Sequence, residues 1–382
     1  MPPRSLAVGI GFTATLSSGV AVWLVVQLGL ASTIGSLDHS PGYFEDFRIY
    51  YEQARLLSVG AAAVVEGWVY PPATALLFLP FAALSRDAAY GAWAVVQAAI
   101  TACLVLRCAH YLPSYPRWQR YAFAAGLVLS SLPVVHCAKW GQLSVAVALL
   151  AMLGLQTRGW RGAALMSLAI SLKLYPLCAV PFYALQKRWR DLAWVLCFAC
   201  IVSGIVPVLA LGCERTALLW TACWANAWKL GQESSLSSQA LSVAIDKWFA
   251  PRGMVAGSPG PVLVALPQLA RQSITLLLAL ASIATTAALS VRRDAALAAA
   301  AWLVCLAILL RPGWVHYFVV LPLAQALLLH YASSTWSLAC CAISWALCAI
   351  SAIASLAFSP FFFVAEYFSV VTLAALYCLL GL

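Results

Sequence analysis

Long apolar runs dominate this chain and restrict it to a few folds. The runs Ser273–Ser290 and Trp336–Leu356, for example, contain no charged residue. Charged residues make up only 9% of the whole chain, whereas a soluble globular protein carries about 25%. Because so few charges cannot cover a surface in water, the sequence predicts an integral membrane protein whose main solvent is lipid.

A helical bundle is the fold class that these runs predict. Backbone groups inside a bilayer must pair within the protein, which leaves helices or a closed barrel. The runs do not alternate polar and apolar residues as barrel strands do. We therefore expect an all-α, polytopic transmembrane helical bundle of about ten to twelve helices, with residues 1–382 forming a single membrane domain. The candidate segments are residues 6–30, 72–84, 88–110, 121–137, 143–157, 162–185, 191–212, 262–290, 295–310, 316–332, 335–358 and 364–382.

The basic residues predict how the chain is oriented. The net charge of +10 comes from lysines and arginines that stand singly or in small clusters between apolar runs. This is the pattern of charges that set membrane topology, and it is not that of a nucleic-acid-binding surface. The densest cluster, Lys187–Arg190, is predicted to be cytoplasmic. Residues 31–70 and 213–261 then form two large outer loops, and Arg311–Tyr317 lies on the same outer face.

Strict alternation of crossings creates one conflict with the charge rule. It places the arginine pairs that follow segments 88–110 and 143–157 on the outer face, where positive charges are disfavoured. Segment 72–84 is short for a span, which needs about 20 residues, and segment 162–185 is interrupted by Lys173 and a proline. If both segments are re-entrant or broken, the arginine pairs move inside and ten full crossings remain. The sequence leaves ten and twelve crossings both open.

The first outer loop concentrates the acidic residues, with five of the chain's 12. Within it, residues 44–59 have helical periodicity, with Phe47, Tyr51 and Ala54 on one apolar stripe. Such a helix would lie along the membrane surface rather than cross it. Asp46 stands at its upstream end, where the helix dipole favours a carboxylate. A capping acid among solvated charges would explain the same pattern without catalysis.

Five groups of short motifs follow one another along the chain. They are Asp46-Phe47-x-x-Tyr50-Tyr51 with Tyr70-Pro71-Pro72, then Gly141-Gln142, then Leu172-Lys173-Leu174-Tyr175-Pro176 with Lys187-Arg188-Trp189-Arg190, then Ser237-Ser238-Gln239-Ala240-Leu241, and finally His316-Tyr317-Phe318 with Leu321-Pro322. In this order they resemble the GT-C glycosyltransferases, and most closely glycosyltransferase family 87, the branch with polyprenyl-phosphate-mannose-dependent alpha-mannosyltransferases. The resemblance extends from about Leu6 to His330. It departs at Gln239, where SSQAL replaces NQSL, and at the single His316, where a doubled histidine is sometimes seen.

The resemblance implies a GT-C fold, with amphipathic helices in the first outer loop, and a reaction. A hexosyl group, in the first place mannosyl, would pass from a polyprenyl-phosphate sugar to a hydroxyl of a lipid or glycan acceptor, with inversion. Asp46 would be the general base, a role that can contribute about 10²–10⁴-fold. His316, and second Lys173, would meet the charge on the leaving phosphate. The further candidates for substrate binding are Glu45, Arg48, Tyr50, Tyr70, Gln142 and Gln239. No DxD pair or carboxylate triad is present, so we expect no metal and no other cofactor.

Several of these residues also have an explanation that needs no catalysis. His316 fits an aromatic belt at the membrane interface, and Lys173 can extend its ammonium group to that interface or pair with a buried acid. Gln142 and Gln239 can form hydrogen bonds between helices. Tyr70-Pro71-Pro72 suits the start of a helix, because proline fits the first helical turn.

Other functions also fit a polytopic chain. A transporter or flippase of a lipid-linked or hydrophobic solute would show internal repeats and several ionisable residues within spans, whereas Lys173 is the one clear example here. An oligosaccharide polymerase or ligase would use an outer loop rich in arginine and histidine, whereas residues 213–261 contain no histidine. The function of a non-catalytic scaffold is a third alternative that the sequence leaves open. We favour a transferase in contact with membrane lipids, in a bacterial inner membrane with its site facing the periplasm; an endoplasmic-reticulum membrane would suit the same chemistry.

Overall fold

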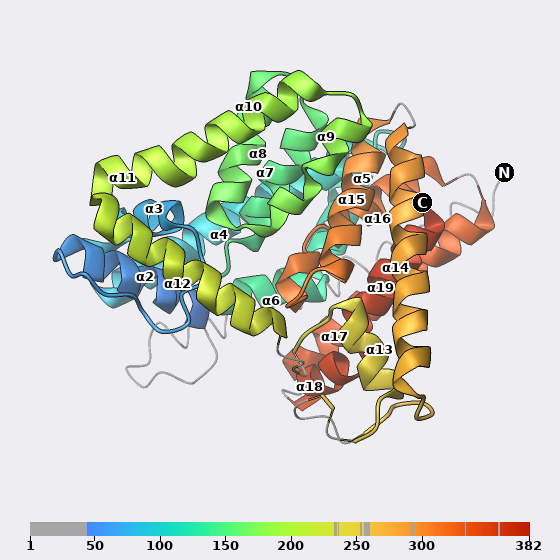
Figure 1. The fold of residues 1–382 in the computed structure, drawn as a ribbon. Helices are drawn as coiled ribbons and strands as arrows, with labels where there is room; N and C mark the ends of the chain where they lie inside the picture. Colours follow the sequence, from blue (N-terminus) through green and yellow to red (C-terminus); the bar gives the residue numbers. More distant parts are fainter. Residues whose placement is uncertain are drawn as a thin grey trace.

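The computed structural model describes residues 44–232, 235, 237–252, 254–255, 260–291, 294–332, 334–357 and 360–382, and these ranges form helices without a sheet (Figure 1). The predicted first span, residues 6–30, and the first part of the first outer loop, residues 31–43, lie outside the described residues. The α-helices are α2 (Glu45–Ser58), α3 (Pro72–Ala82), α4 (Arg86–His110), α5 (Arg117–Leu129), α6 (Leu132–Trp140), α7 (Ser144–Gln156), α8 (Trp160–Leu172), α9 (Pro181–Leu185), α10 (Trp189–Cys200), α11 (Val206–Leu211), α12 (Cys213–Gln232), α13 (Leu241–Phe249), α14 (Gln268–Val291), α15 (Ala295–Leu309), α16 (Leu321–Tyr331), α17 (Thr335–Ala357), α18 (Pro360–Tyr367) and α19 (Val370–Gly381). Three short helical turns of other types are η1 (Tyr175–Ala179), η2 (Ile201–Ile205) and η3 (Val315–Phe318).

The longest helices coincide with predicted spans. Helix α4, the continuous segment from α10 to α11, α14 and α17 are each long and apolar enough to cross a membrane. Helices α5 and α6 qualify together as a fifth candidate, although the chain bends by 63° between them. The all-α polytopic fold is thereby confirmed. The predicted ten to twelve crossings exceed the four or five that length and composition support among the described helices.

Breaks within apolar segments account for this difference. Segment 162–185 divides into α8, η1 and α9, which confirms the interruption predicted at Lys173. Segment 316–332 divides into η3 and α16, a break that the apolar pattern did not predict. Proline occupies the first turn of η1, α9 and α16. Because proline suits a first turn and interrupts a continuing helix, one apolar segment becomes two or three short helices.

The helices run between two ends of the molecule. At one end, Arg188 donates to the carbonyl oxygen of Thr157 at 2.6 Å; we call this the basic end. At the other end, Lys173 donates to Ser144 Oγ at 2.8 Å; we call this the α2 end, because α2 and α3 pack together there. Helix α7 connects the two ends, and at 1.5 Å per residue it is about 20 Å long.

Helix α3 stays at the α2 end. Thr74, near its start, donates to the carbonyl oxygen of Leu172 at 2.8 Å, and Tyr51 donates to the Leu84 carbonyl oxygen just after its finish at 3.0 Å. Because α3 does not run to the other end, α4 is the helix that leads to the basic end. The arginine pairs after α4 and α7 therefore lie with the Lys187–Arg190 cluster, and the conflict with the charge rule disappears.

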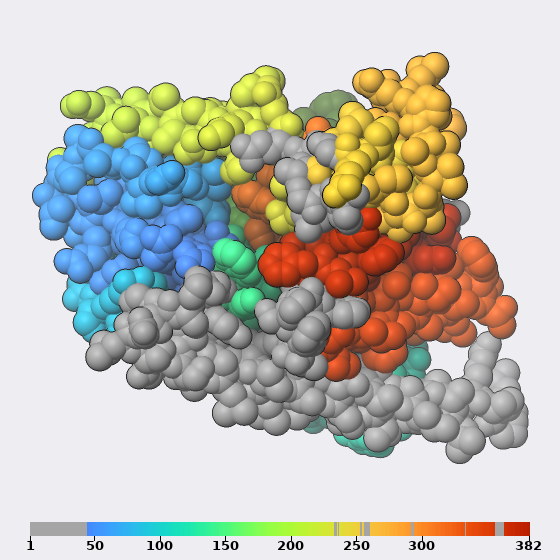
Figure 2. Space-filling view, turned by 90° about the horizontal axis from the view of Figure 1, so that it is seen from below, coloured from blue at the N-terminus to red at the C-terminus, as the bar shows by residue number. Residues whose placement is uncertain are grey.

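The region predicted as the second outer loop, residues 213–261, contains helices α12 and α13. Helix α12 lies across the α2 end (Figure 1), and its Arg215 donates to the carbonyl oxygen of Gly60 at 2.6 Å. Helix α13 lies beside the C-terminal residues, where Trp248 donates to the Phe368 carbonyl oxygen at 3.1 Å (Figure 2). The region predicted as a loop is therefore partly helical, with one helix of 20 residues and one of nine.

Candidate active site

Helix α2 holds Asp46 in its first turn. The helix buries Phe47, Tyr51 and Ala54 on one face, which confirms the predicted apolar stripe. Phe47 stacks on Trp93 of α4, with ring centroids 5.6 Å apart. This packing fixes the rotation of α2 about its axis and leaves Asp46 half-buried at the edge of the core.

Gln142 reaches Asp46 because α6 ends at Gly141. The φ angle of Gly141 is +71°, and a Cβ atom there would lie 2.7 Å from Cβ of Phe47. Glycine adopts this conformation at little cost and commonly ends helices in this way. The next residue, Gln142, donates from Nε2 to Oδ2 of Asp46. The Gly141-Gln142 pair therefore couples α6 to α2.

Packing of α3 on the end of α8 brings Tyr70 and Lys173 together. Helix α8 ends at Leu172, and Lys173 follows in an extended conformation. Lys173 is 5% exposed, and its Nζ lies 5.6 Å from the centroid of the Tyr70 ring. Tyr70-Pro71-Pro72 thus sets the start of α3 and also holds a phenol beside a buried lysine.

One amide joins the acid to the cation. Gln142 Oε1 accepts from Lys173 Nζ at 2.6 Å and from the Tyr50 hydroxyl at 3.1 Å. Gln142 Nε2 donates to Asp46 and, at 3.4 Å, to the Tyr70 hydroxyl. The structure therefore brings five predicted site residues into contact, and we call them the Asp46 cluster.

Burial controls the charge of Asp46. Removal from water raises the pKa of this carboxyl group to about 6, while the positive charge of Lys173 and the hydrogen bond from Gln142 lower it. Desolvation disfavours the charged form, and a nearby cation favours it. A carboxyl group with a pKa near 6 is mostly ionised at pH 7 and can accept a proton.

A cavity of about 280 Å³ opens beside the Asp46 cluster, and its lining includes Tyr70, Lys173, Tyr175 and Tyr317. The rings of Tyr175 and Tyr317 stack with centroids 4.9 Å apart, and the Tyr317 centroid lies 5.3 Å from Lys173 Nζ. Asp46 does not line this cavity and lies behind its wall. A negatively charged ligand in the cavity would therefore meet Lys173 first.

His316 lies at the same end, in η3. It is 4% exposed, and neither ring nitrogen has a hydrogen-bond partner among the described residues. Its ring centroid lies 5.0 Å from that of Tyr317, and it stacks on His136 of α6 at 5.9 Å. Because buried polar groups normally have partners, an imidazole with two unpartnered nitrogens is a candidate for ligand binding.

Besides His316, three predicted site residues lie outside the Asp46 cluster. Arg48 forms ion pairs with Glu45 at 3.0 Å and with Glu52 at 3.5 Å on the outer face of α2. Gln239 is buried between α13 and the C-terminal helices, where its Nε2 donates to the carbonyl oxygen of Glu366 at 3.1 Å. Glu45 and Arg48 pair because they lie one helical turn apart. Direct substrate contact by Glu45, Arg48 or Gln239 stays a prediction.

Three residues near the cluster were not identified from the sequence. Ser144 accepts from Lys173 at 2.8 Å, Tyr317 presents its ring to the same ammonium group, and His136 stacks on His316. His136 interrupts an apolar run, and an ionisable residue in such a run is itself a signal of function. Tyr317 lies in the motif that contains His316, whereas no comparable signal separates Ser144 from the other serines of the chain.

The chain is predicted to need no metal or other cofactor. Within the described ranges, no group of three or more His, Cys, Asp or Glu side chains is arranged to hold a metal ion. The prediction itself concerns the reaction and stays a prediction.

Comparison with known proteins identifies a family. The sequence profile described as Glycosyltransferase family 87 matches residues 68–312, which include Tyr70 and Lys173 and exclude Asp46 and His316. The polyprenol-phosphate-mannose-dependent alpha-(1-2)-phosphatidylinositol mannoside mannosyltransferase of Mycolicibacterium smegmatis is 26% identical over 193 residues. That alignment covers 47% of this chain and 43% of the relative, so the chain spans less than half the length of the relative it matches. No solved structure matches the chain.

The family match and the geometry agree. The profile covers well over half of the chain, and it includes the lysine and the tyrosine that line the cavity. The apolar helices place these residues in a membrane protein. The chain belongs to glycosyltransferase family 87.

Proposed function

We propose that the chain transfers a hexosyl group, in the first place mannosyl, from a polyprenyl-phosphate sugar to a hydroxyl group of a lipid or glycan acceptor. The observation that carries this proposal is the single amide of Gln142, which bonds both to Asp46 and to the buried Lys173 beside a cavity. Transfer from a sugar phosphate needs a base for the acceptor and a cation for the leaving group. The printed name of the mycobacterial relative specifies a polyprenol-phosphate-mannose donor, which supports the same donor here.

Asp46 acts as the general base in this proposal. The acceptor oxygen attacks the anomeric carbon while its proton passes to Asp46, and the bond between that carbon and the phosphate oxygen breaks. The electron pair leaves with the phosphate, and attack from the opposite side inverts the configuration. Asp46 lies behind the cavity wall, and catalytic contacts of this kind often form only when substrate is bound.

Lys173 and His316 receive the leaving phosphate in this proposal. Lys173 donates to Gln142 and Ser144 and lines the cavity with its remaining surface. A neutral imidazole of His316 can donate one N–H to a phosphate oxygen. Donors held in place before the reaction stabilise developing charge without reorganisation, and one such donor is typically worth about 10²–10³-fold in rate.

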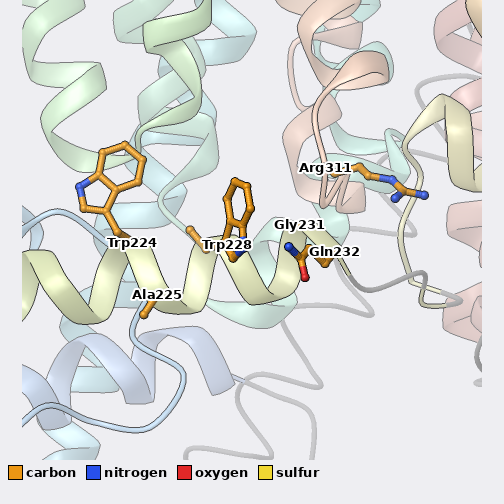
Figure 3. Close-up of a pocket in the computed structure, with 7 residues that line it drawn as sticks. Trp224, Ala225, Trp228, Gly231, Gln232 and Arg311 are labelled. Carbon is orange, nitrogen blue, oxygen red and sulfur yellow. The ribbon is translucent and has the colours of Figure 1, made fainter.

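An open depression of about 690 Å³ suits the isoprenoid part of the donor. It is lined mainly by α12 and shares Trp224 and Arg311 with the cavity. Figure 3 shows the indoles of Trp224 and Trp228 on the same side of α12. Trp228 is 73% exposed, and apolar surface of this kind marks a binding groove or a membrane contact. The prenyl chain would lie over these indoles, with its phosphate at Lys173.

The charge pattern supports a site on the outer face of the membrane. The Asp46 cluster lies at the end opposite Arg188 and the other arginines of the basic end. Because cytoplasmic segments carry the excess of positive charge, the cluster would face the periplasm of a bacterial inner membrane.

An Asp46→Asn variant tests the proposal. The wild-type protein in lipid nanodiscs is given polyprenyl-phosphate-mannose and a glycolipid or oligosaccharide acceptor, and the product is measured by mass spectrometry. We expect wild-type transfer and a fall in kcat on the order of 10²–10⁴-fold in the variant. The melting temperature should change little, because asparagine has the same shape and keeps an oxygen for Gln142.

Glu52→Gln is the matched control, because Glu52 lies on the exposed face of the same helix. It should transfer sugar at the wild-type rate. Normal transfer by Asp46→Asn would remove Asp46 from the mechanism. No transfer from any polyprenyl-phosphate sugar, together with flux of a lipid-linked solute in vesicles, would favour the transporter instead.

A further inference from the structure

A second buried lysine lies in α13, outside the Asp46 cluster. Lys247 is 0% exposed. Its ammonium group donates to the carbonyl oxygens of Ser238 and Glu366 at 2.6 and 2.7 Å, and to the Ser369 hydroxyl at 3.2 Å. An ammonium group has three N–H bonds, so these contacts use all of them. The role of Lys247 must therefore lie in what it holds together.

The ammonium group of Lys247 joins two distant parts of the chain. Ser238 precedes α13, whereas Glu366 and Ser369 belong to the junction between α18 and α19. The next residue, Gln239, strengthens the same joint. Its Nε2 donates to the Glu366 carbonyl oxygen at 3.1 Å, and its own carbonyl oxygen accepts from Thr372 at 2.5 Å. Ser238 and Gln239 are therefore held against the C-terminal helices, and we call these two residues the clamped segment.

The clamped segment in turn positions the chain before His316. The backbone N–H of Gln239 donates to the Gly313 carbonyl oxygen at 2.5 Å, and Ser238 forms an isolated antiparallel bridge with Trp314. A Cβ atom at Gly313 would lie 2.5 Å from a backbone nitrogen of the facing segment, so the two strands of chain are in close contact. The Trp314 and His316 rings are 5.4 Å apart. The position of His316 therefore depends on that of the clamped segment.

We propose that Lys247 is a positioning residue for the site: through Ser238 and Gln239 it holds Gly313 and Trp314, and thereby orients His316. The role given to His316 rests on the proposed function, whereas the mechanical link rests on the contacts alone. Without the ammonium group, two buried carbonyl oxygens lose a donor, which is costly. The segment can then move away from the α18–α19 junction, and the residues before His316 move with it.

A Lys247→Met variant tests this role, with Arg271→Met as the matched control. Arg271 of α14 is also buried, at 4% exposed. It donates at 2.9 Å to Asp246 of α13, the helix that contains Lys247. Its other bonds go to Leu266 and Met254, away from the clamped segment. Two quantities are measured for each purified variant in nanodiscs. One is the rate at which diethyl pyrocarbonate modifies His316, followed by peptide mass spectrometry; the other is transfer kinetics with each substrate varied.

We expect Lys247→Met to raise the modification rate of His316 several-fold, whereas Arg271→Met leaves it at the wild-type value. Because a misplacement of about 1 Å can cost on the order of 10²-fold in rate, kcat/KM for the donor should fall by that factor in Lys247→Met. The KM of the acceptor should not change. Arg271→Met should lower the melting temperature without altering the ratio of the two KM values.

An unchanged modification rate in Lys247→Met, with only a lower melting temperature as in the control, would overturn the inference. If the wild-type protein transfers no sugar, the proposed function fails. The modification rate of His316 still decides whether Lys247 positions it, because that measurement needs no turnover.

Discussion

The two buried lysines differ in what their ammonium groups bind. Lys173 donates to two side-chain oxygens, those of Gln142 and Ser144, and lines a cavity. Lys247 donates to two backbone carbonyl oxygens and one hydroxyl, and it is fully enclosed. Burial of an ammonium group is costly in both cases, so burial alone does not separate a binding site from a structural joint. The hydrogen-bond partners separate the two cases. The side chains of Gln142 and Ser144 can rotate and release the ammonium group to a ligand, whereas backbone carbonyl oxygens cannot release it without a change of fold.

Among the changes that compare the two lysine sites, replacement of Lys173 should have the largest effect on activity. In Lys173→Met, the leaving phosphate loses a cation, and we expect kcat to fall on the order of 10²–10³-fold. The melting temperature should fall less than in Lys247→Met, because the groups that lose a donor are the side chains of Gln142 and Ser144 and not backbone carbonyl oxygens. Transfer assays and thermal unfolding in the same nanodiscs measure both quantities. Equal destabilisation by Lys173→Met and Lys247→Met would erase the difference between the two sites.

The next largest effects are expected from substitution of two glycines, one beside each lysine site. Gly141→Ala forces a non-glycine residue to φ +71° and against Phe47, which should cost about 1–3 kcal/mol. Gly313→Ala places a methyl group against the clamped segment and should also destabilise. Gly141→Ala should disturb Gln142 and therefore the pH dependence of transfer, whereas Gly313→Ala should raise the KM of the donor. Chemical unfolding and pH-dependent kinetics distinguish them, and identical kinetic changes would contradict separate roles.

Much of the Asp46 cluster could be predicted from the sequence, through the resemblance of its motifs to family 87 and through the places that some of its residues occupy in the apolar pattern. Asp46 opens an amphipathic segment, Gln142 follows a glycine, and Lys173 interrupts an apolar run. Each of these local signals survives in the structure as a helix start, a helix end and a break between helices. Their mutual contacts were not predictable, because the contacts depend on how α2, α6 and α8 pack.

The joint around Lys247 was not predicted at all. Its contacts link Ser238 to Glu366 across more than a hundred residues of chain, and no periodicity reports such a contact. Gln239 was assigned to substrate because of its motif, whereas its amide bonds to the α18–α19 junction. Helix α12 was also missed, since its tryptophans and polar residues lower its hydropathy below that of a span although Trp220, Trp224 and Trp228 share one face.

The pH dependence of transfer should follow Asp46. Its pKa of about 6 lies above the ordinary value for an aspartic acid, and the protonated form cannot accept a proton from the acceptor. We therefore expect kcat/KM to be level above pH 7 and to fall about tenfold per pH unit below pH 6. Lys173→Met should move the inflection to higher pH, because the cation that lowers this pKa is gone, whereas Lys247→Met should leave it in place. A flat profile between pH 5 and 7 would exclude Asp46 as the titrating base.

The smallest effect is expected for Arg48, which belongs to neither lysine site. Its ion pairs with Glu45 and Glu52 lie on the surface of α2, where its side chain is 41% exposed. Exposed pairs of this kind contribute less than about 1 kcal/mol and weaken with salt. Arg48→Gln should therefore leave the melting temperature and both KM values near wild type at physiological salt. A clear rise in the KM of the donor would instead support the substrate contact that the motif predicts. It would also mean that the donor headgroup extends across α2, beyond the cavity that Lys173 lines. The surface charge of Arg48 would then act together with the buried charge of Lys173.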